Sequence, residues 1–76
     1  MDNYNDLKSI IAKELNCQVA DITNDAGWNK TYNWDSLAHI GIISAIELHF
    51  SIQIEDNQIE NLKDFKSILQ YINDKK

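Results

Sequence analysis

The sequence of 76 residues contains no proline, only two glycines and a single cysteine. Because proline and glycine interrupt helices, their scarcity allows long helices to run unbroken. The single cysteine, Cys17, excludes an internal disulfide. We interpret it as a small buried apolar residue, because its neighbours in the sequence include no basic side chain that would lower the pKa of the thiol.

Long apolar runs are also lacking. No stretch approaches the ~20 apolar residues that span a bilayer, and the N-terminal residues lack the basic and apolar segments of a signal peptide. The sequence therefore predicts a cytoplasmic protein that does not insert into membranes.

Basic residues are scarce, since seven Lys and Arg stand against twelve Asp and Glu, which gives a net charge of -5. Nucleic-acid binding requires clustered basic side chains, so we expect no nucleic-acid partner. His39 and His49 do not have the i, i+4 spacing of a ligand pair on a helix, and we predict no metal site. A chain of this length forms one small core, so we predict a single domain over residues 1–76, acting as a monomer.

The spacing of apolar residues predicts an all-α fold, a small four-helix bundle with three main helices and one short helix. We expect the first helix over residues 5–16, a long irregular loop over residues 17–33 and the second helix over residues 36–50. Asp56 is expected to cap a short third helix and Asp64 a fourth. The apolar residues that define the first, third and fourth helices are Leu7, Ile10, Ile11 and Leu15, then Ile59 and Leu62, then Phe65, Ile68, Leu69 and Ile72.

The apolar residues of the second helix fall into two groups on opposite sides, at about 100° per residue. The core stripe is formed by Ile42, Ile43, Ile46 and Phe50, and the second group by Leu37, Ile40, Gly41, Ser44 and Leu48. Either the long loop folds over the second group and buries it, or the group is exposed and docks partner proteins. We favour docking. A glycine inside a helix costs about 1 kcal/mol relative to alanine, and close approach by a partner at Gly41 would compensate for that cost.

The tripeptide Asp35-Ser36-Leu37 opens this helix, which ends in the segment 46–50 (IELHF) and is followed by the segment 52–56 (IQIED). An amphipathic helix and a long loop precede the tripeptide, and another apolar helix closes the chain. Together these features resemble the acyl carrier protein family over nearly the whole sequence. Asp-Ser-Leu alone is a weak signal, so the resemblance depends on this context.

The resemblance implies that Ser36 is the attachment site for 4'-phosphopantetheine, which a separate, magnesium-dependent phosphopantetheinyl transferase takes from coenzyme A. The thiol of this arm would hold an acyl group as a thioester for acyl-loading and acyl-using enzymes. The chain would then be a carrier of acyl intermediates and not an enzyme. Asp35 and Leu37 flank the attachment site. Asp35 can cap the helix, but we favour recognition by the transferase, or by its metal, as the role of its charge.

Three alternatives remain open at this point. Ser36 could be an ordinary helix cap, because serine is common in that position. The chain could also carry aminoacyl or peptidyl groups on the same arm. Finally, it could be a docking module without a prosthetic group, acting only through Leu37, Ile40 and Leu48.

Members of the family that serve fatty acid biosynthesis tend to have a glycine two residues before the serine and acidic residues along the second helix. Here Trp34 takes the place of the glycine, and Ala38, Gly41, Leu48 and His49 stand where Asp or Glu are common. We therefore expect docking through apolar contact, with little electrostatic steering. Within lipid metabolism and related biosynthesis, these departures favour a specialised pathway over the housekeeping one.

Several side chains near the tripeptide have two interpretations. His39 is either a partly buried structural histidine or a contact for the arm, and we favour the structural role. Trp28, Tyr32 and Trp34 either belong to the core or line a pocket for the carried group, and we favour the core. An acidic patch either meets basic partner enzymes or is simply solvated; it consists of Glu47, Glu55, Asp56 and Glu60.

Overall fold

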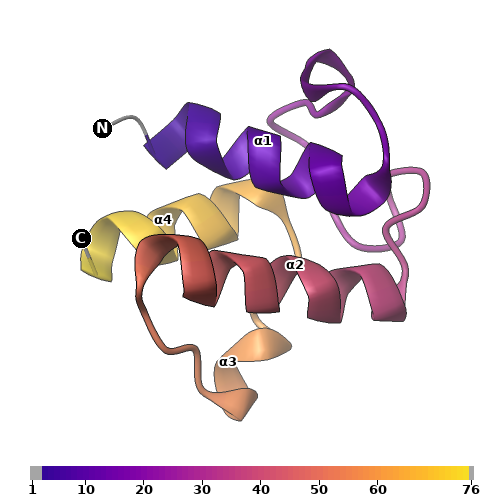
Figure 1. Ribbon diagram of the computed structural model, residues 1–76. Coiled ribbons are helices and arrows are strands. Elements are labelled where there is room, and N and C mark those ends of the chain that lie inside the picture. The colour runs from indigo at the N-terminus through magenta and orange to yellow at the C-terminus, as the bar shows by residue number, and fades with distance from the viewer. Residues whose placement is uncertain (1–2, 76) are drawn as a thin grey trace.

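Four α-helices account for most of residues 3–75, the part of the chain that the computed structural model describes (Figure 1). They are α1 (Asn3–Leu15), α2 (Ser36–Phe50), α3 (Asp56–Ile59) and α4 (Phe65–Lys75), and a 3₁₀ helix, η1 (Val19–Asp21), lies between α1 and α2. No strand is formed within residues 3–75. The prediction of an all-α bundle with three main helices and one short helix is confirmed, and α2 has the predicted bounds.

The core lies where α1, α2 and α4 face one another. α1 and α2 run antiparallel, and both α2 and α4 pack against α1 (Figure 1). Each helix contributes one apolar stripe, and burial of each such side chain stabilises the fold by about 1.5–3 kcal/mol. The predicted core stripe of α2 is buried. The core residues of the three helices are Leu7, Ile11, Ala12 and Leu15, then Ile42, Ile43, Ile46 and Phe50, then Phe65, Ile68 and Ile72. Among the helices within residues 3–75, none has the length and apolarity needed to cross a membrane.

The long connection between α1 and α2 follows an irregular path, as predicted, and is anchored in its middle and near its C-terminal end. Ala26 and Trp34 are buried in the core. The N–H of Trp28 donates to the carbonyl of Lys63 at 2.8 Å, and the N–H of Phe65 donates to the carbonyl of Ala26 at 2.9 Å. These two hydrogen bonds hold the connection against the start of α4.

One of the two helix caps expected in the C-terminal half is correct. Asp64 caps α4, since its Oδ1 accepts a hydrogen bond from the N–H of Ser67 at 2.8 Å. The prediction that Asp56 caps the third helix is wrong. Asp56 is itself the first residue of α3, and Glu55 stands in the cap position without a side-chain cap hydrogen bond. A capping side chain must belong to the residue that precedes the helix.

The prediction that Cys17 is buried is also wrong, because its side chain is exposed. Asn16 adopts the left-handed conformation, with φ 58°, and the N–H of Cys17 donates back to the carbonyl of Ala12 at 2.9 Å. This is the usual geometry at the C-terminal end of a helix. It turns residue 17 away from the buried stripe that ends with Leu15.

Candidate functional site

The start of α2 presents Ser36 to solvent and leaves the capping role to its neighbour. Asp35 has an extended backbone, and its Oδ1 accepts a hydrogen bond from the N–H of Ala38 at 2.9 Å. Ser36 is therefore the first helical residue, and its side chain is exposed. The alternative that Ser36 is an ordinary helix cap is wrong, because Asp35 already occupies that position.

The first turn of α2 suits an anionic group bonded to the oxygen of Ser36. The first N–H groups of a helix lack partners within it, and the helix dipole places partial positive charge at this end. Asp35 satisfies the N–H of Ala38, but the N–H groups of Ser36 and Leu37 have no hydrogen-bond partner within residues 3–75. A phosphodiester on Ser36 would face these donors, so the residues present fit such a group.

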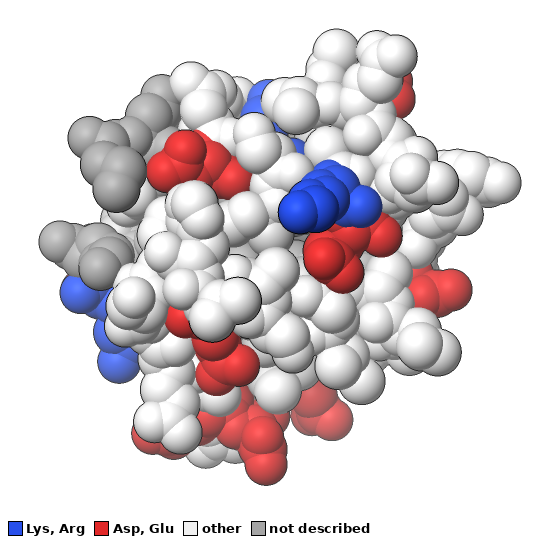
Figure 2. Space-filling model, in the orientation of Figure 1, with Lys and Arg blue, Asp and Glu red and all other residues white. Residues whose placement is uncertain are grey.

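The second apolar group of α2 is exposed, so the long connection does not bury it. Leu37, Ile40 and Leu48 expose 81%, 63% and 85% of their surface, and Ser44 is exposed as well. We call these four residues the exposed apolar face. Figure 2 shows largely uncharged surface where α2 lies, with acidic side chains around it. The alternative that the loop covers this face is wrong, and docking of partners on it stays a prediction.

Gly41 lies at the edge of the exposed apolar face and is half-buried against α1. A Cβ added at Gly41 would lie 2.5 Å from Oε1 of Glu14 in α1. The absence of a side chain therefore leaves room for the carboxylate of Glu14, which comes from the chain itself. Sequence reasoning missed Glu14, and the glycine inside the helix was the only signal of a neighbour at this point.

His39 has the structural role that we favoured, and it is more deeply buried than expected. Its side chain is 1% exposed, and Trp34, also buried, donates a hydrogen bond from Nε1 to Nδ1 of His39 at 3.0 Å. Trp28 is half-buried and stacks on the imidazole, with ring centroids 4.8 Å apart. Tyr32 is 87% exposed, so the prediction that it belongs to the core is wrong.

Burial is the main influence on the pKa of His39. Desolvation lowers this pKa below the ordinary value for histidine, and the charge of Lys63 lowers it further, while the hydrogen bond to the carbonyl of Ile59 opposes the shift. The imidazole is therefore neutral at neutral pH. Because Nδ1 accepts from Trp34, the proton resides on Nε2.

The remaining polar residues of α2 have structural partners. Oε2 of Glu47 accepts a hydrogen bond from the N–H of Ile54 at 2.8 Å, which holds the segment after α2 against the helix. Nε2 of His49 lies 3.4 Å from Oδ2 of Asp6 and links α2 to α1. Within residues 3–75, no three His, Cys, Asp or Glu side chains are grouped in a way that could hold a metal ion.

Comparisons with known proteins agree with this geometry. A family model described as "Phosphopantetheine attachment site" matches residues 5–72. A protein named "Acyl carrier protein" from Helicobacter pylori strain J99 is 34% identical over 73 residues, which cover 96% of this chain and 94% of the relative. One from Buchnera aphidicola subsp. Schizaphis graminum is 39% identical over 69 residues, covering 91% and 87%. One from Thermosynechococcus vestitus is 32% identical over 69 residues, covering 91% and 85%.

Proposed function

Because this chain belongs to the acyl carrier protein family, we propose that Ser36 carries 4'-phosphopantetheine and that the thiol of this arm holds an acyl group as a thioester. Proteins of this family are carriers and not enzymes, and their cofactor is covalently attached 4'-phosphopantetheine. The arm supplies the thiol that holds the cargo. The residues of this chain bind and orient the arm at the start of α2.

One observation carries the proposal for Ser36. Its hydroxyl is exposed at the first position of α2, while Asp35 performs the capping that a serine could otherwise perform. The hydroxyl is thus available to a transferase without loss of the helix cap. The phosphate that joins the arm to Ser36 would be stabilised by the unpaired N–H groups of the first turn and by the helix dipole.

We further propose that phosphopantetheinyl transferase, acyl-loading enzymes and acyl-using enzymes dock on the exposed apolar face, next to Gly41. Leu37 and Ile40 lie within two turns of Ser36, so a partner that covers them can also reach the arm. The face itself carries no charge, and salt should weaken this docking little. Asp35 is the acidic residue closest to Ser36 in the sequence, and its proposed role is recognition by the transferase.

We propose that the protein serves a specialised pathway in the cytoplasm. Residues 1–76 would form a single carrier domain that acts as a monomer. Trp34 supports the specialised pathway, because a buried tryptophan takes the place of the small residue expected before the serine. The scarcity of acids along α2 supports it too. Fatty acid biosynthesis is consistent with relatives named "Acyl carrier protein", and the proposal is for a dedicated branch of such acyl chemistry.

The test is intact mass spectrometry after incubation with coenzyme A, magnesium and a transferase of broad specificity. We expect the full chain to gain one phosphopantetheine, Ser36→Ala to gain none, and Ser9→Ala on the exposed side of α1 to gain one. An unchanged mass of the natural chain, or addition that persists in Ser36→Ala, would falsify the proposal.

An amino acid on the thiol of protein purified from its native cell would instead identify an aminoacyl carrier. Biological activity retained by Ser36→Ala but lost in Leu37→Asp would identify a docking module.

A further inference from the structure

The interior of the bundle beside Ser36 is closed by three side chains and one carbonyl, which we name the Trp–His latch: Trp28, Trp34, His39 and the carbonyl of Ile59. Nε1 of Trp34 donates to Nδ1 of His39 at 3.0 Å. Nε2 of His39 donates to the carbonyl of Ile59 at 3.2 Å. Trp28 stacks on the imidazole, with planes 18° apart. The latch therefore joins the long connection, α2 and the end of α3.

The latch lies close to the proposed attachment site. His39 comes three residues after Ser36, about 4.5 Å further along the axis of α2. Its side chain points into the core, where it is 1% exposed. An acyl chain bound through Ser36 that entered the core along α2 would meet the imidazole within the first turn.

Opening the latch would leave several buried polar groups without partners. Both ring nitrogens of His39 are in use, and within residues 3–75 no buried side-chain nitrogen or oxygen lacks a hydrogen bond. An acyl chain brings no donors or acceptors that could replace these bonds. The indole N–H of Trp34 and both ring nitrogens of His39 would each lose a partner at a cost of about 1–3 kcal/mol, and at about 0.8 kcal/mol for each buried methylene that loss offsets the burial of roughly four methylene groups or more. Entry would also require displacement of Trp34, which is packed in the core at 2% exposure.

We propose that the Trp–His latch keeps the carried acyl group outside the bundle, so that this carrier suits short or polar acyl groups and not long alkyl chains. This inference rests on the proposed attachment at Ser36. His39 acts as a positioning residue, because it closes the interior without touching the thioester. The exposed apolar face remains available to partner enzymes.

The test compares a short and a long cargo on the full chain. A transferase adds acetyl- or decanoyl-4'-phosphopantetheine from the matching coenzyme A thioester, releasing adenosine 3',5'-bisphosphate, and intact mass shows whether the arm has been added. The two loaded forms are then compared by melting temperature and by the NMR signal of the Trp34 indole N–H. For the natural chain we expect the two melting temperatures to agree within about 1 °C and the Trp34 signal to be the same in both forms.

The variant His39→Ala removes the imidazole and opens space for the chain. In this variant the decanoyl form should melt about 4 °C or more above the acetyl form, because the alkyl chain can now be buried. His49→Ala, on the exposed side of the same helix, is the matched control and should behave like the natural chain. If His39→Ala does not fold, Trp34→Phe removes the indole donor and retains most of the ring volume.

Failure of this inference is distinguishable from failure of the proposed function. A decanoyl form of the natural chain that is stabilised like that of His39→Ala, or that moves the Trp34 signal, overturns the inference. An arm absent by mass overturns the proposed function instead. In that case a decyl or methyl group is attached by alkylation of Ser36→Cys in a Cys17→Ser background, which needs no transferase, and the same two readouts decide whether the interior accepts the chain.

Discussion

At the start of α2, Oδ1 of Asp35 accepts a hydrogen bond from the N–H of Ala38 at 2.9 Å, and at the start of α4, Oδ1 of Asp64 accepts one from the N–H of Ser67 at 2.8 Å. In both cases an aspartate caps the helix through the residue three positions later. The first helical residues differ, because Ser36 is exposed whereas Phe65 is 1% exposed. The same cap therefore serves a candidate site in one helix and the core in the other.

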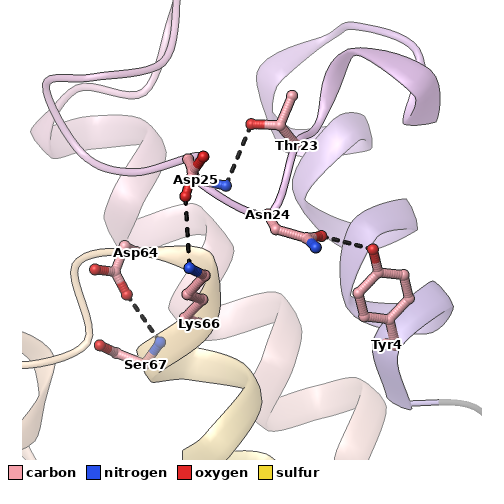
Figure 3. A network of polar contacts seen from close by, with 7 residues as sticks. All are labelled: Tyr4, Thr23, Asn24, Asp25, Asp64, Lys66 and Ser67. Atoms are coloured by element: carbon pink, nitrogen blue, oxygen red, sulfur yellow. Dashed lines mark hydrogen bonds and ion pairs between the residues drawn. The ribbon is translucent and has the colours of Figure 1, made fainter.

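The surroundings of the two caps explain this difference. Figure 3 shows the start of α4 beside the long connection, with Nζ of Lys66 3.6 Å from Oδ1 of Asp25, and the hydroxyl of Tyr4 in α1 2.6 Å from Oδ1 of Asn24 in the same connection. The first N–H of α4, that of Phe65, is also satisfied by the carbonyl of Ala26. At α2, the corresponding N–H of Ser36 has no partner within residues 3–75. A helix start whose donors are used by the fold is structural, and one whose donors are free can receive a ligand.

The largest expected change in the free energy of unfolding comes from truncating the side chain of the first residue of each helix. Phe65→Ala should lower the free energy of unfolding by about 3–5 kcal/mol, because it deletes a fully buried aromatic ring. Ser36→Ala should change it by less than about 0.5 kcal/mol, because the hydroxyl is exposed and caps nothing. Urea denaturation followed by tryptophan fluorescence measures both. A loss above 1 kcal/mol on substitution of Ser36 would mean that the start of α2 is structural too.

Local features were the most predictable from the sequence. The bounds of α2 follow from its apolar run, and the caps at Asp35 and Asp64 follow from an aspartate immediately before a helix. Asp56 shows where such reasoning fails. α3 begins at Asp56 itself, after a segment in which the N–H of Ile54 donates to the carboxylate of Glu47, and the local pattern does not report that contact between distant residues.

Contacts between distant parts of the chain could not be predicted. The hydrogen bond from Trp34 to His39 depends on how the long connection folds back on α2, and no spacing rule describes it. The approach of Glu14 to Gly41 joins two helices that are separated by that connection. Sequence patterns report which face of a helix is apolar, but not which side chain of another element will lie against it.

Acid should affect the two helix starts through different groups. Burial lowers the pKa of His39, one turn into α2, below the value of about 6.5 that it has when unfolded. Because the unfolded chain then takes up a proton that the folded chain does not, stability falls as the pH drops below that value, by at most about 1.4 kcal/mol per pH unit. The hydrogen bond from the N–H of Ser67 lowers the pKa of Asp64, so its contribution is present above the unfolded pKa and is lost only as the pH falls through the folded pKa.

Urea denaturation of the natural chain, His39→Gln and Asp64→Asn at several pH values separates these two effects. Between pH 7.5 and pH 5, roughly the range around the unfolded pKa of histidine, His39→Gln should flatten the decline and Asp64→Asn should not. Below about pH 4, Asp64→Asn should flatten the decline in stability and His39→Gln should not, because the carboxylate of Asp64 then begins to protonate in the unfolded chain. A decline near neutral pH that is unchanged in His39→Gln would show that burial of this imidazole does not couple folding to pH.

The smallest expected effects come from the capping aspartates, and these sharpen the comparison most. Asp35→Ala and Asp64→Ala should each lower the free energy of unfolding by about 1 kcal/mol, because each deletes one cap. Asp35→Asn and Asp64→Asn should retain most of the stability near neutral pH, since asparagine caps helices equally well. The rate of phosphopantetheine transfer to Ser36 should nevertheless fall about tenfold in Asp35→Asn, because a charged contact with the transferase or its metal is lost. Asp64→Asn should leave that rate unchanged. Equal rates in the two asparagine variants would show that Asp35 acts only as a cap, as Asp64 does. The start of α2 would then differ from that of α4 through the exposed hydroxyl of Ser36 and the N–H groups of the first turn that are free within residues 3–75.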